Sequence, residues 1–258
     1  MTVFPNRFEG RRAIVTGASR GIGRAAAIRL AAEGARVGLV ARGRPGLEEV
    51  AAVISGAGGD CRVLPADCSV EGEVREAFDD AVRGWGGLDV VVANAGIELA
   101  DQDAPVDRLA LETWQRLLSA NLTGQFLTCK HGARHLLETG GGAIVCLGSN
   151  CGSLGMALGE PGYSASKGGI FAMMRVMAAD YAPLGIRVNM VIPGFIDTPM
   201  NAYAFADPAT AKRWSDPIPL KRPGTAEECA AAILWLASDE ASYCVGAALV
   251  VDGGQSAV

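Results

Sequence analysis

Hydrophobic positions follow two alternating patterns along most of the chain. Short runs of apolar and β-branched residues are separated by longer segments of helical periodicity, as in residues 22–33, where Ile22, Ala26 and Leu30 recur on one face. Gly34 is a suitable end for that helix. Runs that are apolar throughout, such as LDVVVANAG, are typical of central strands buried on both faces of a parallel sheet.

Seven segments are expected to form strands. They are Arg12–Thr16, Arg36–Val40, Cys61–Leu64, Leu88–Ala93, Ala143–Leu147, Arg187–Ile192 and Ala247–Val251. Because helical segments stand between them, the pattern predicts an α/β fold, a Rossmann-like doubly wound parallel sheet of about seven strands flanked by helices.

The chain contains no linker rich in Ser, Gly and Pro, so residues 1–258 are expected to form a single domain. One long segment, Thr198–Gly224, breaks the alternation and contains five prolines and three aromatic residues, Tyr203, Phe205 and Trp214. Loops of this length in compact domains are usually functional or disordered. The aromatic residues favour a lid over a substrate site.

Composition narrows the classes of partner. With 50% hydrophobic residues, the chain of 258 residues can bury a large core without a metal or a disulfide. A net charge of −5 without long runs of one sign argues against nucleic acid or a membrane as partner and favours a small molecule. The seven cysteines are odd in number and lack CxxC spacing, and we see neither a leader nor a membrane-spanning run, so a cytoplasmic protein is expected.

A glycine-rich stretch, TGASRGIG, follows the first expected strand and opens the first expected helix. Glycines at positions 17, 21 and 23 allow a tight turn and a close approach of the backbone to a pyrophosphate, which the helix N-terminus would stabilise. Alone, such a motif also occurs in turns that serve packing only. Its spacing here is GxxxGxG instead of GxGxxG.

The stretch resembles the TGxxxGxG fingerprint of the short-chain dehydrogenase/reductase family, and further matches follow in the family's order over nearly the whole chain. ANAG matches the family's NNAG motif, with Ala93 as a small departure, and residues 193–198 match its PGxxxT segment beside the nicotinamide. The cofactor-binding residues that the resemblance implies are Gly17, Ser19, Arg20, Gly21, Ile22, Gly23, Arg42, Asp67, Cys68, Asn94, Gly96, Tyr163, Lys167, Pro193, Gly194, Ile196 and Thr198.

Charge after the second expected strand predicts the choice of cofactor. Rossmann sites that use NAD place a carboxylate there for the ribose hydroxyls, and this carboxylate would repel a 2′-phosphate. Here Ala41 stands at the acidic position, Arg42 follows it, and Arg20 lies in the glycine-rich stretch. Two cations without an anion suit a phosphate, so NADP(H) is predicted over NAD(H). The alternative is that both arginines are merely solvated.

The stretch PGYSASKGG places Tyr163 and Lys167 four residues apart, on one face of a helix. A phenol with a pKa of about 10 is a poor base at neutral pH, and a nearby ammonium is expected to lower that pKa. The resemblance implies a catalytic tetrad in which Tyr163 is the general acid and base and Ser149 hydrogen-bonds the same substrate oxygen. In it, Lys167 also holds the ribose, and Asn121 positions a water.

Two alternatives remain open at this site. A surface helix with a packed tyrosine and an exposed lysine would explain YxxxK alone, but not the accompanying motifs. Ser153 is a remote second choice for Ser149, because the separation from Ser149 to Tyr163 is slightly longer than usual, which indicates an extra residue in the GEPG turn. No metal is expected, since His131 and His135 lack the glutamate of HExxH and a third ligand.

The substrate pocket is expected to be largely apolar. The residues expected to line it are Met156, Leu158, Phe195, Met200 and Tyr203, with Glu160 as a polar contact. The favoured function is NADP(H)-dependent reduction of a small or medium hydrophobic ketone, or oxidation of the corresponding secondary alcohol.

Three other functions fit parts of the sequence. An NAD-dependent polyol or sugar dehydrogenase is the main alternative. A 3-oxoacyl-carrier-protein reductase is disfavoured because Leu127 and Leu184 stand at positions associated with carrier-docking arginines, and a non-catalytic dinucleotide sensor because Tyr163 and Lys167 are both present. The family resemblance also implies a homotetramer or a homodimer.

Overall fold

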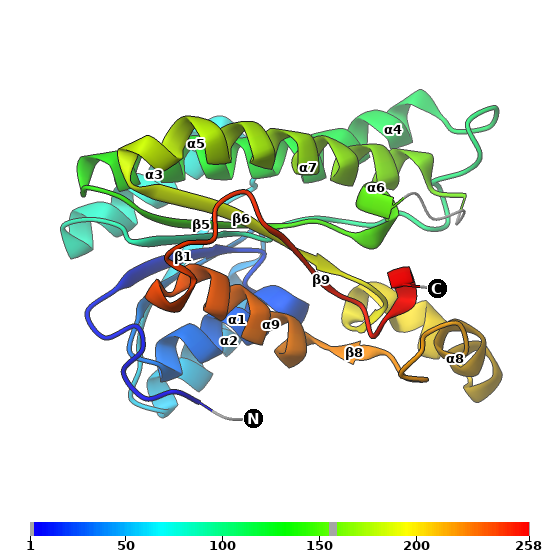
Figure 1. The fold of residues 1–258 in the computed structure, drawn as a ribbon, viewed down its shortest axis with the longest axis horizontal. Helices are drawn as coiled ribbons and strands as arrows, with labels where there is room; N and C mark the ends of the chain where they lie inside the picture. The colour runs from blue at the N-terminus through cyan, green and yellow to red at the C-terminus, as the bar shows by residue number, and fades with distance from the viewer. Residues whose placement is uncertain (1–2, 155–158, 258) are drawn as a thin grey trace.

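One parallel sheet of seven strands forms the centre of the computed structural model, in the order β3-β2-β1-β4-β5-β6-β9 (Figure 1). The structure describes residues 3–152 and 159–257 in full and only the backbone of residues 153–154. The strands are β1 (Arg12–Thr16), β2 (Arg36–Ala41), β3 (Asp60–Pro65), β4 (Val90–Ala93), β5 (Gly142–Leu147), β6 (Ile186–Pro193) and β9 (Ala248–Val251). All seven expected strands are confirmed, with ends that differ by at most two residues.

Helices cover both faces of the sheet, as predicted (Figure 1). One face carries α1 (Gly21–Ala32), α2 (Arg44–Gly56) and α9 (Ala226–Ala237), and the other carries α3 (Glu71–Trp85), α5 (Gly124–Glu138) and α7 (Pro161–Tyr181). Each face has its own hydrophobic core. Leu30 and Ile233 are fully buried in the first, and Phe78 and Met174 in the second.

Shorter elements lie mostly at the carboxyl ends of the strands, where the loops gather. They are α4 (Leu111–Leu117), a π-helix (Leu118–Thr123), α6 (Asn150–Leu154), a 3-10 helix (Pro199–Phe205) and α8 (Pro208–Ser215), with a small parallel pair β7 (Ile196–Asp197) and β8 (Gly224–Thr225). The remaining 3-10 helices are Ala182–Leu184, Asp239–Ala241 and Gln255–Ala257.

The proline-rich segment Thr198–Gly224 is more regular than a loop. It contains the 3-10 helix and α8, and β7 pairs with β8 so that its two ends lie together, with Ile196 opposite Gly224. Phe195, Ala204 and Ile218 form a small hydrophobic cluster of their own within and beside it. The segment therefore folds as a compact cap with a narrow attachment to the rest of the chain.

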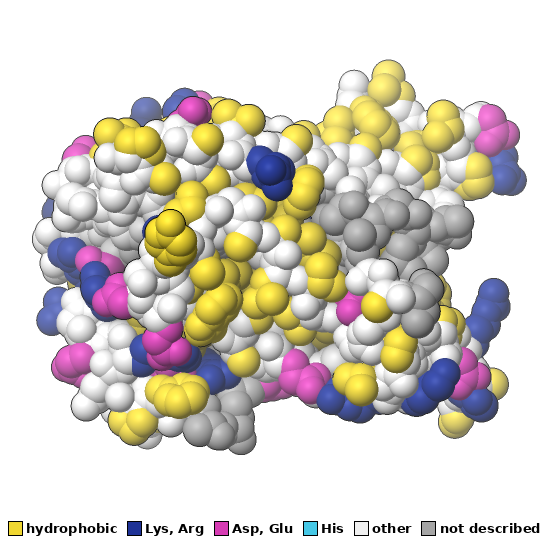
Figure 2. Space-filling model, viewed as in Figure 1, with side chains coloured by type: hydrophobic (Ala, Val, Ile, Leu, Met, Phe, Trp, Pro, Cys, Tyr) yellow, Lys and Arg dark blue, Asp and Glu magenta, His cyan; other side chains and the backbone are white. Residues whose placement is uncertain are grey.

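The face that presents β9 is apolar near its middle. Figure 2 shows hydrophobic side chains gathered there, with most Lys, Arg, Asp and Glu side chains around the border. Tyr243, Val245 and Val250, in or near β9, are all exposed. Within the described part of the chain, no helix has both the length and the apolar character needed to cross a membrane.

Candidate active site

The strand order reverses between β1 and β4, which are neighbours in the sheet. In open α/β sheets, ligands bind in the crevice at the carboxyl ends of the strands at such a point. Asn94, directly after β4, donates from Nδ2 to Thr16 O at 2.9 Å and from its backbone N–H to Thr16 Oγ1 at 3.1 Å. These bonds join the segment after β4 to the glycine-rich turn after β1.

The glycines of the turn are required for two different reasons. Gly17 has a φ of +68°, a conformation that other residues rarely adopt. At Gly23 the reason is space, because an added Cβ would collide with Gly17 O and with Asn94 Nδ2. No described side chain caps the N-terminus of α1, which leaves its first amides for a ligand.

Two cavities that share lining residues lie over this edge of the sheet, and most of the sequence-predicted residues line one or the other. The groove is lined by Gly17, Ser19, Arg20, Gly21, Ile22, Arg42, Asp67, Cys68, Asn94, Gly96 and Thr198. The catalytic cavity is lined by Ser149, Tyr163, Lys167, Pro193, Gly194 and Ile196, and also by Ile22, Asn94, Gly96 and Thr198. Gly23 and Asn121 line neither cavity. Each contacts residues that line the groove instead, Gly23 packing against Gly17 and Asn94, and Asn121 bonding to Ile97.

The groove is positively charged at the end near β2. Arg20 and Arg42 are both exposed there, and Arg116 of α4, which no sequence motif indicated, also lines the groove. Burial alone would raise the pKa of Asp67, but hydrogen bonds from Ser69 and the charge of Arg42 hold that pKa below its usual value. Asp67 is therefore ionised at neutral pH, with Ser69 N–H and Oγ donating to Oδ1 at 2.9 and 2.7 Å.

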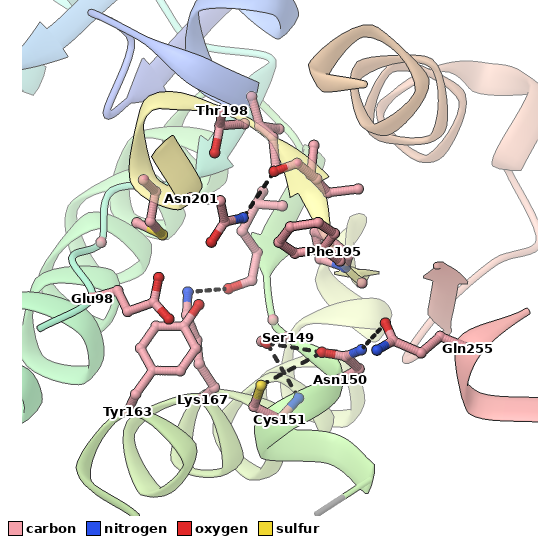
Figure 3. Close-up of a pocket in the computed structure, with 18 of the residues that line it drawn as sticks. Glu98, Ser149, Asn150, Cys151, Tyr163, Lys167, Phe195, Thr198, Asn201 and Gln255 are labelled. Atoms are coloured by element: carbon pink, nitrogen blue, oxygen red, sulfur yellow. Dashed lines mark hydrogen bonds between the residues drawn. The ribbon is translucent and has the colours of Figure 1, made fainter. Parts of the chain in front are cut away.

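Tyr163 and Lys167 lie on the first turns of α7 and face the catalytic cavity (Figure 3). Only 9% of Tyr163 and 4% of Lys167 is exposed. Lys167 Nζ donates to Leu147 O at 3.1 Å and lies 5.7 Å from the centroid of the Tyr163 ring. Burial lowers the pKa of Lys167 to about 8.

The expectation that the pKa of Tyr163 is lowered is wrong. The pKa of Tyr163 is raised, chiefly by burial and next by the charge of Glu98, whereas the hydrogen bond with Ser149 opposes the rise. A desolvated phenol with a carboxyl nearby disfavours a second negative charge. Tyr163 is therefore a protonated acid at neutral pH.

Ser149 and its neighbours form the side of the cavity opposite Glu98 in the view of Figure 3. Ser149 Oγ accepts from Cys151 N–H at 3.2 Å, and Asn150 donates from Nδ2 to Gln255 Oε1 at 3.0 Å. The chain's last turn thus reaches the cavity, which no motif had indicated. The side chain of Ser153 and all of Met156 and Leu158 lie outside the described residues.

Asn121 is fully buried in the π-helix between α4 and α5. Such irregular turns occur frequently at functional sites. Its Oδ1 accepts from Ile97 N–H at 2.7 Å, and its Nδ2 donates to Ile97 O and to Ser166 Oγ, both at 3.0 Å. A Cβ at Gly96 would lie 3.2 Å from Asn121 Oδ1 and 3.5 Å from Lys167 Nζ. Asn121 therefore clamps the segment after β4 against α7.

Two acidic residues on that segment were missed by sequence reasoning. Asp103, which is buried, accepts the backbone N–H of Gly162 at 3.0 Å and of Tyr163 at 2.7 Å. It thus stabilises the N-terminus of α7 from outside the helix. Glu98 lines the catalytic cavity, whereas Glu160, expected as the polar contact, does not and lies against Glu98 instead. Burial and then the charge of Glu160 raise the pKa of Glu98 to about 8.

Aromatic residues close the far side of the cavity. Phe195 stacks on Phe205 and on Trp214, with ring centroids 5.3 and 5.4 Å apart, and Tyr203 meets Trp214 edge to face at 6.0 Å. Of the residues expected to line the pocket, Phe195, Met200 and Tyr203 do so, together with Trp214. The cap formed by Thr198–Gly224 therefore contributes part of the cavity wall.

Comparison with known sequences gives matches over nearly the whole chain. A family profile described as Enoyl-(Acyl carrier protein) reductase matches residues 17–256. Glucose 1-dehydrogenase of Gluconobacter oxydans is 39% identical over 97% of this chain and 94% of its own length. 3beta-hydroxysteroid dehydrogenase 1 of Eggerthella lenta is 40% identical (96% and 94%), and cis-4-hydroxycyclohexanecarboxylate dehydrogenase of Sinomonas cyclohexanicum is 43% identical (97% and 98%).

Solved structures share the fold closely. A short-chain type dehydrogenase/reductase from Mycobacterium marinum superposes with a TM-score of 0.91 at 36% identity, covering 96% of each chain. Levodione reductase gives a TM-score of 0.92 at 35% identity, covering 97% of this chain and 99% of its own. The named relatives act on chemically different molecules, so the matches leave the substrate open.

Proposed function

The chain belongs to the short-chain dehydrogenase/reductase family of NAD(P)-using oxidoreductases, and on this premise we propose that it is an NADP(H)-dependent enzyme that interconverts a ketone and a secondary alcohol. The observation that carries the proposal is the convergence of Tyr163, Lys167 and Ser149 on a cavity that shares lining residues with the groove. The relatives include dehydrogenases of secondary alcohols, which supports action on alcohol and ketone groups.

The residues of the groove fit a dinucleotide. Gly17 and Gly23 leave space that a Cβ would fill, and the amides at the start of α1 suit a pyrophosphate. The exposed Arg20 and Arg42, with Ala41 in place of a carboxylate, favour a cofactor with a 2′-phosphate. When bound, the nicotinamide supplies or accepts the hydride.

Proton transfer falls to Tyr163. In reduction, its protonated hydroxyl donates to the carbonyl oxygen as charge develops there, and in oxidation it takes the proton of the alcohol. Ser149, which lines the same cavity, steadies the same oxygen. Lys167, with a pKa lowered to about 8, holds its ammonium beside the phenol and has donors left for a ribose hydroxyl. Asn121 keeps the segment after β4 in place behind them.

The cap Thr198–Gly224 is proposed as a lid over the substrate. Its aromatic contacts with Phe195 and its attachment through β7 and β8 suit closure as a unit. The chain is proposed to act as a single catalytic domain in a reducing cytoplasm, which the seven free cysteines favour. The apolar face over β9 (Figure 2), together with exposed Phe126 and Val176 on α5 and α7, suits assembly into a homotetramer or homodimer.

An NAD-linked polyol or sugar dehydrogenase is the second candidate. The glucose 1-dehydrogenases among the relatives, at 39% and 38% identity, favour a polyhydroxylated substrate. The absence of a carboxylate at Ala41 argues against NAD as the cofactor.

A substrate screen tests the proposed function. Ketones and secondary alcohols are supplied with each reduced or oxidised nucleotide, and absorbance of the reduced nicotinamide is followed. We expect turnover with NADP(H), and the Tyr163→Phe variant to be slower by about 100- to 10,000-fold, the usual contribution of a general acid or base. No turnover on a broad panel, with retained dinucleotide binding, would favour a sensor instead.

A further inference from the structure

Glu98 is held in a defined place beside the reacting groups. It follows Ile97, whose backbone N–H and C=O are both bonded by Asn121. In Figure 3 its carboxyl points toward Lys167 and the hydroxyl end of Tyr163, on the side away from Ser149. A substituent on the carbon next to one whose oxygen is held by Tyr163 and Ser149 can therefore reach Glu98.

Glu98 is supported by a second carboxyl that does not line the cavity. Glu160, directly before α7, lies close enough to hydrogen-bond Glu98 when one of the two is protonated. Glu160 Oε2 is buried, and no N–H or O–H donor among the described residues reaches it. A proton shared between Glu98 and Glu160 satisfies this acceptor. Asp103 does not share a proton with Glu160 in this way, because its carboxylate accepts two backbone amides of α7.

The charges around the pair decide what it can bind. Glu160 and Asp103 add negative charge to its surroundings, and the Lys167 ammonium lies on the cavity side. The Lys167 ammonium would repel a substrate cation bound beside Glu98, whereas it would not repel a neutral hydroxyl. With the shared proton held between the two carboxyls, Glu98 presents an acceptor oxygen to the cavity, which suits the O–H of a substrate hydroxyl. Phe195, Met200 and Trp214, which also line the cavity, are apolar.

We propose that Glu98, supported by Glu160, is a specificity-determining residue that selects substrates with a hydroxyl on the carbon next to the reacting one, namely vicinal diols and α-hydroxyketones. This inference rests on the proposed function and narrows its substrate class. It replaces the expectation of a largely apolar pocket, because Glu98 is the acidic side chain on the cavity wall within the described residues.

A matched pair of alcohols tests the proposal. The catalytic efficiency, kcat/KM, is measured for cyclohexane-1,2-diol, as separate cis and trans isomers, and for cyclohexanol, with NADP⁺ as the oxidant. We expect the better diol isomer to exceed cyclohexanol by about 10- to 100-fold, the range for a hydrogen bond that involves a charged group. Glu98→Leu should abolish most of that ratio, whereas Glu98→Gln, which keeps an acceptor oxygen, should retain more of it.

Asp107→Asn is the control, because Asp107 belongs to the same segment and its side chain is 79% exposed. Its diol ratio should equal that of the parent protein. A ratio that Glu98→Leu leaves unchanged would overturn the role of Glu98. So would a parent protein that prefers cyclohexanol, or one that prefers 2-aminocyclohexanol to the diol.

Calorimetric binding of both alcohols to the cofactor complex of Tyr163→Phe keeps the two proposals distinguishable. Diol-selective, Glu98-dependent binding without turnover in the parent protein would contradict the oxidoreductase and support the role of Glu98. Turnover of alcohols without a preference that depends on Glu98 would support the oxidoreductase and overturn the role of Glu98.

Discussion

The groove and the catalytic cavity share a wall but are built from different parts of the chain. Both include Ile22, Asn94, Gly96, Thr198 and Met200 in their lining. The groove depends on backbone close to the ends of β1, β2 and β4, with glycines where a side chain would block it. The cavity depends on side chains from segments far apart in the chain.

The side chains that line the catalytic cavity are scattered along the sequence. Glu98, Ser149, Tyr163, Trp214 and Gln255 each come from a different element or loop. A backbone cradle leaves a mark in the sequence, because few residues other than glycine can occupy it. A side-chain cavity leaves a weaker mark, since many residue types can form its walls. The two halves should therefore respond differently to substitution, as the following predictions state.

Of the next three substitutions, Arg42→Ala should give the largest effect, confined to the groove. We expect kcat/KM with NADPH to fall by about 10- to 100-fold, since hydrogen bonds to charged groups are worth roughly 1.5–3 kcal/mol. Efficiency with NADH should stay unchanged. Steady-state kinetics with both nucleotides measure the ratio, and Arg44→Ala, two positions on and paired with Glu48 at 3.6 Å, is the control. Equal losses with both nucleotides would show that Arg42 does not recognise the 2′-phosphate.

Gly23→Ala should displace Gly17 and Asn94 in the lining of the groove, because the added Cβ would collide with both. Overpacking of this kind costs about 1–3 kcal/mol, so we expect dinucleotide affinity to fall by roughly 10-fold and the midpoint of thermal unfolding to drop. Titration calorimetry and a thermal melt measure the two effects. Gly72→Ala is the matched control, because a Cβ there meets nothing within 4 Å and an exposed helical position tolerates alanine. Unchanged affinity in Gly23→Ala would contradict the steric role.

Glu98→Gln should give the smallest effect, seen as a change in the pH dependence of stability. The pKa of Glu98 is raised from 4.5 to about 8, so the folded state holds a proton that the unfolded state releases. The parent protein should therefore lose stability as pH rises from 4.5 through 8, by roughly 1–3 kcal/mol more than Glu98→Gln, which cannot ionise. The neighbouring Glu160, Asp103 and Lys167 also act on this titration.

Urea unfolding at pH 5.5 and pH 8.5 measures this difference. Asp107→Asn should follow the parent protein at both values, because its exposed carboxyl is well solvated. Identical pH slopes for Glu98→Gln and the parent protein would mean that Glu98 is ionised in the folded state at neutral pH.

Much of the fold and of the groove could be predicted from the sequence. The seven strands follow from buried apolar runs, and the turn at Gly17 follows from glycine spacing between a strand and a helix. Ordered motifs predicted the tetrad residues but not the direction of the Tyr163 pKa, which burial and the charge of Glu98 raise. Glu98 and Asp103 lie in a stretch without a motif, where an acidic residue normally indicates only a solvated surface.

The sequence by itself determined the α/β architecture, the glycine cradle and the phenol–ammonium pair at helical spacing, because these depend on local periodicity and on single backbone positions. Only the tertiary structure decided which acidic side chain lines the catalytic cavity. It buries Glu98 against Glu160, anchors α7 through Asp103 and brings Gln255 to Asn150. The physical reason is that burial and charge depend on neighbours that folding assembles from distant segments, and no spacing along the chain records them.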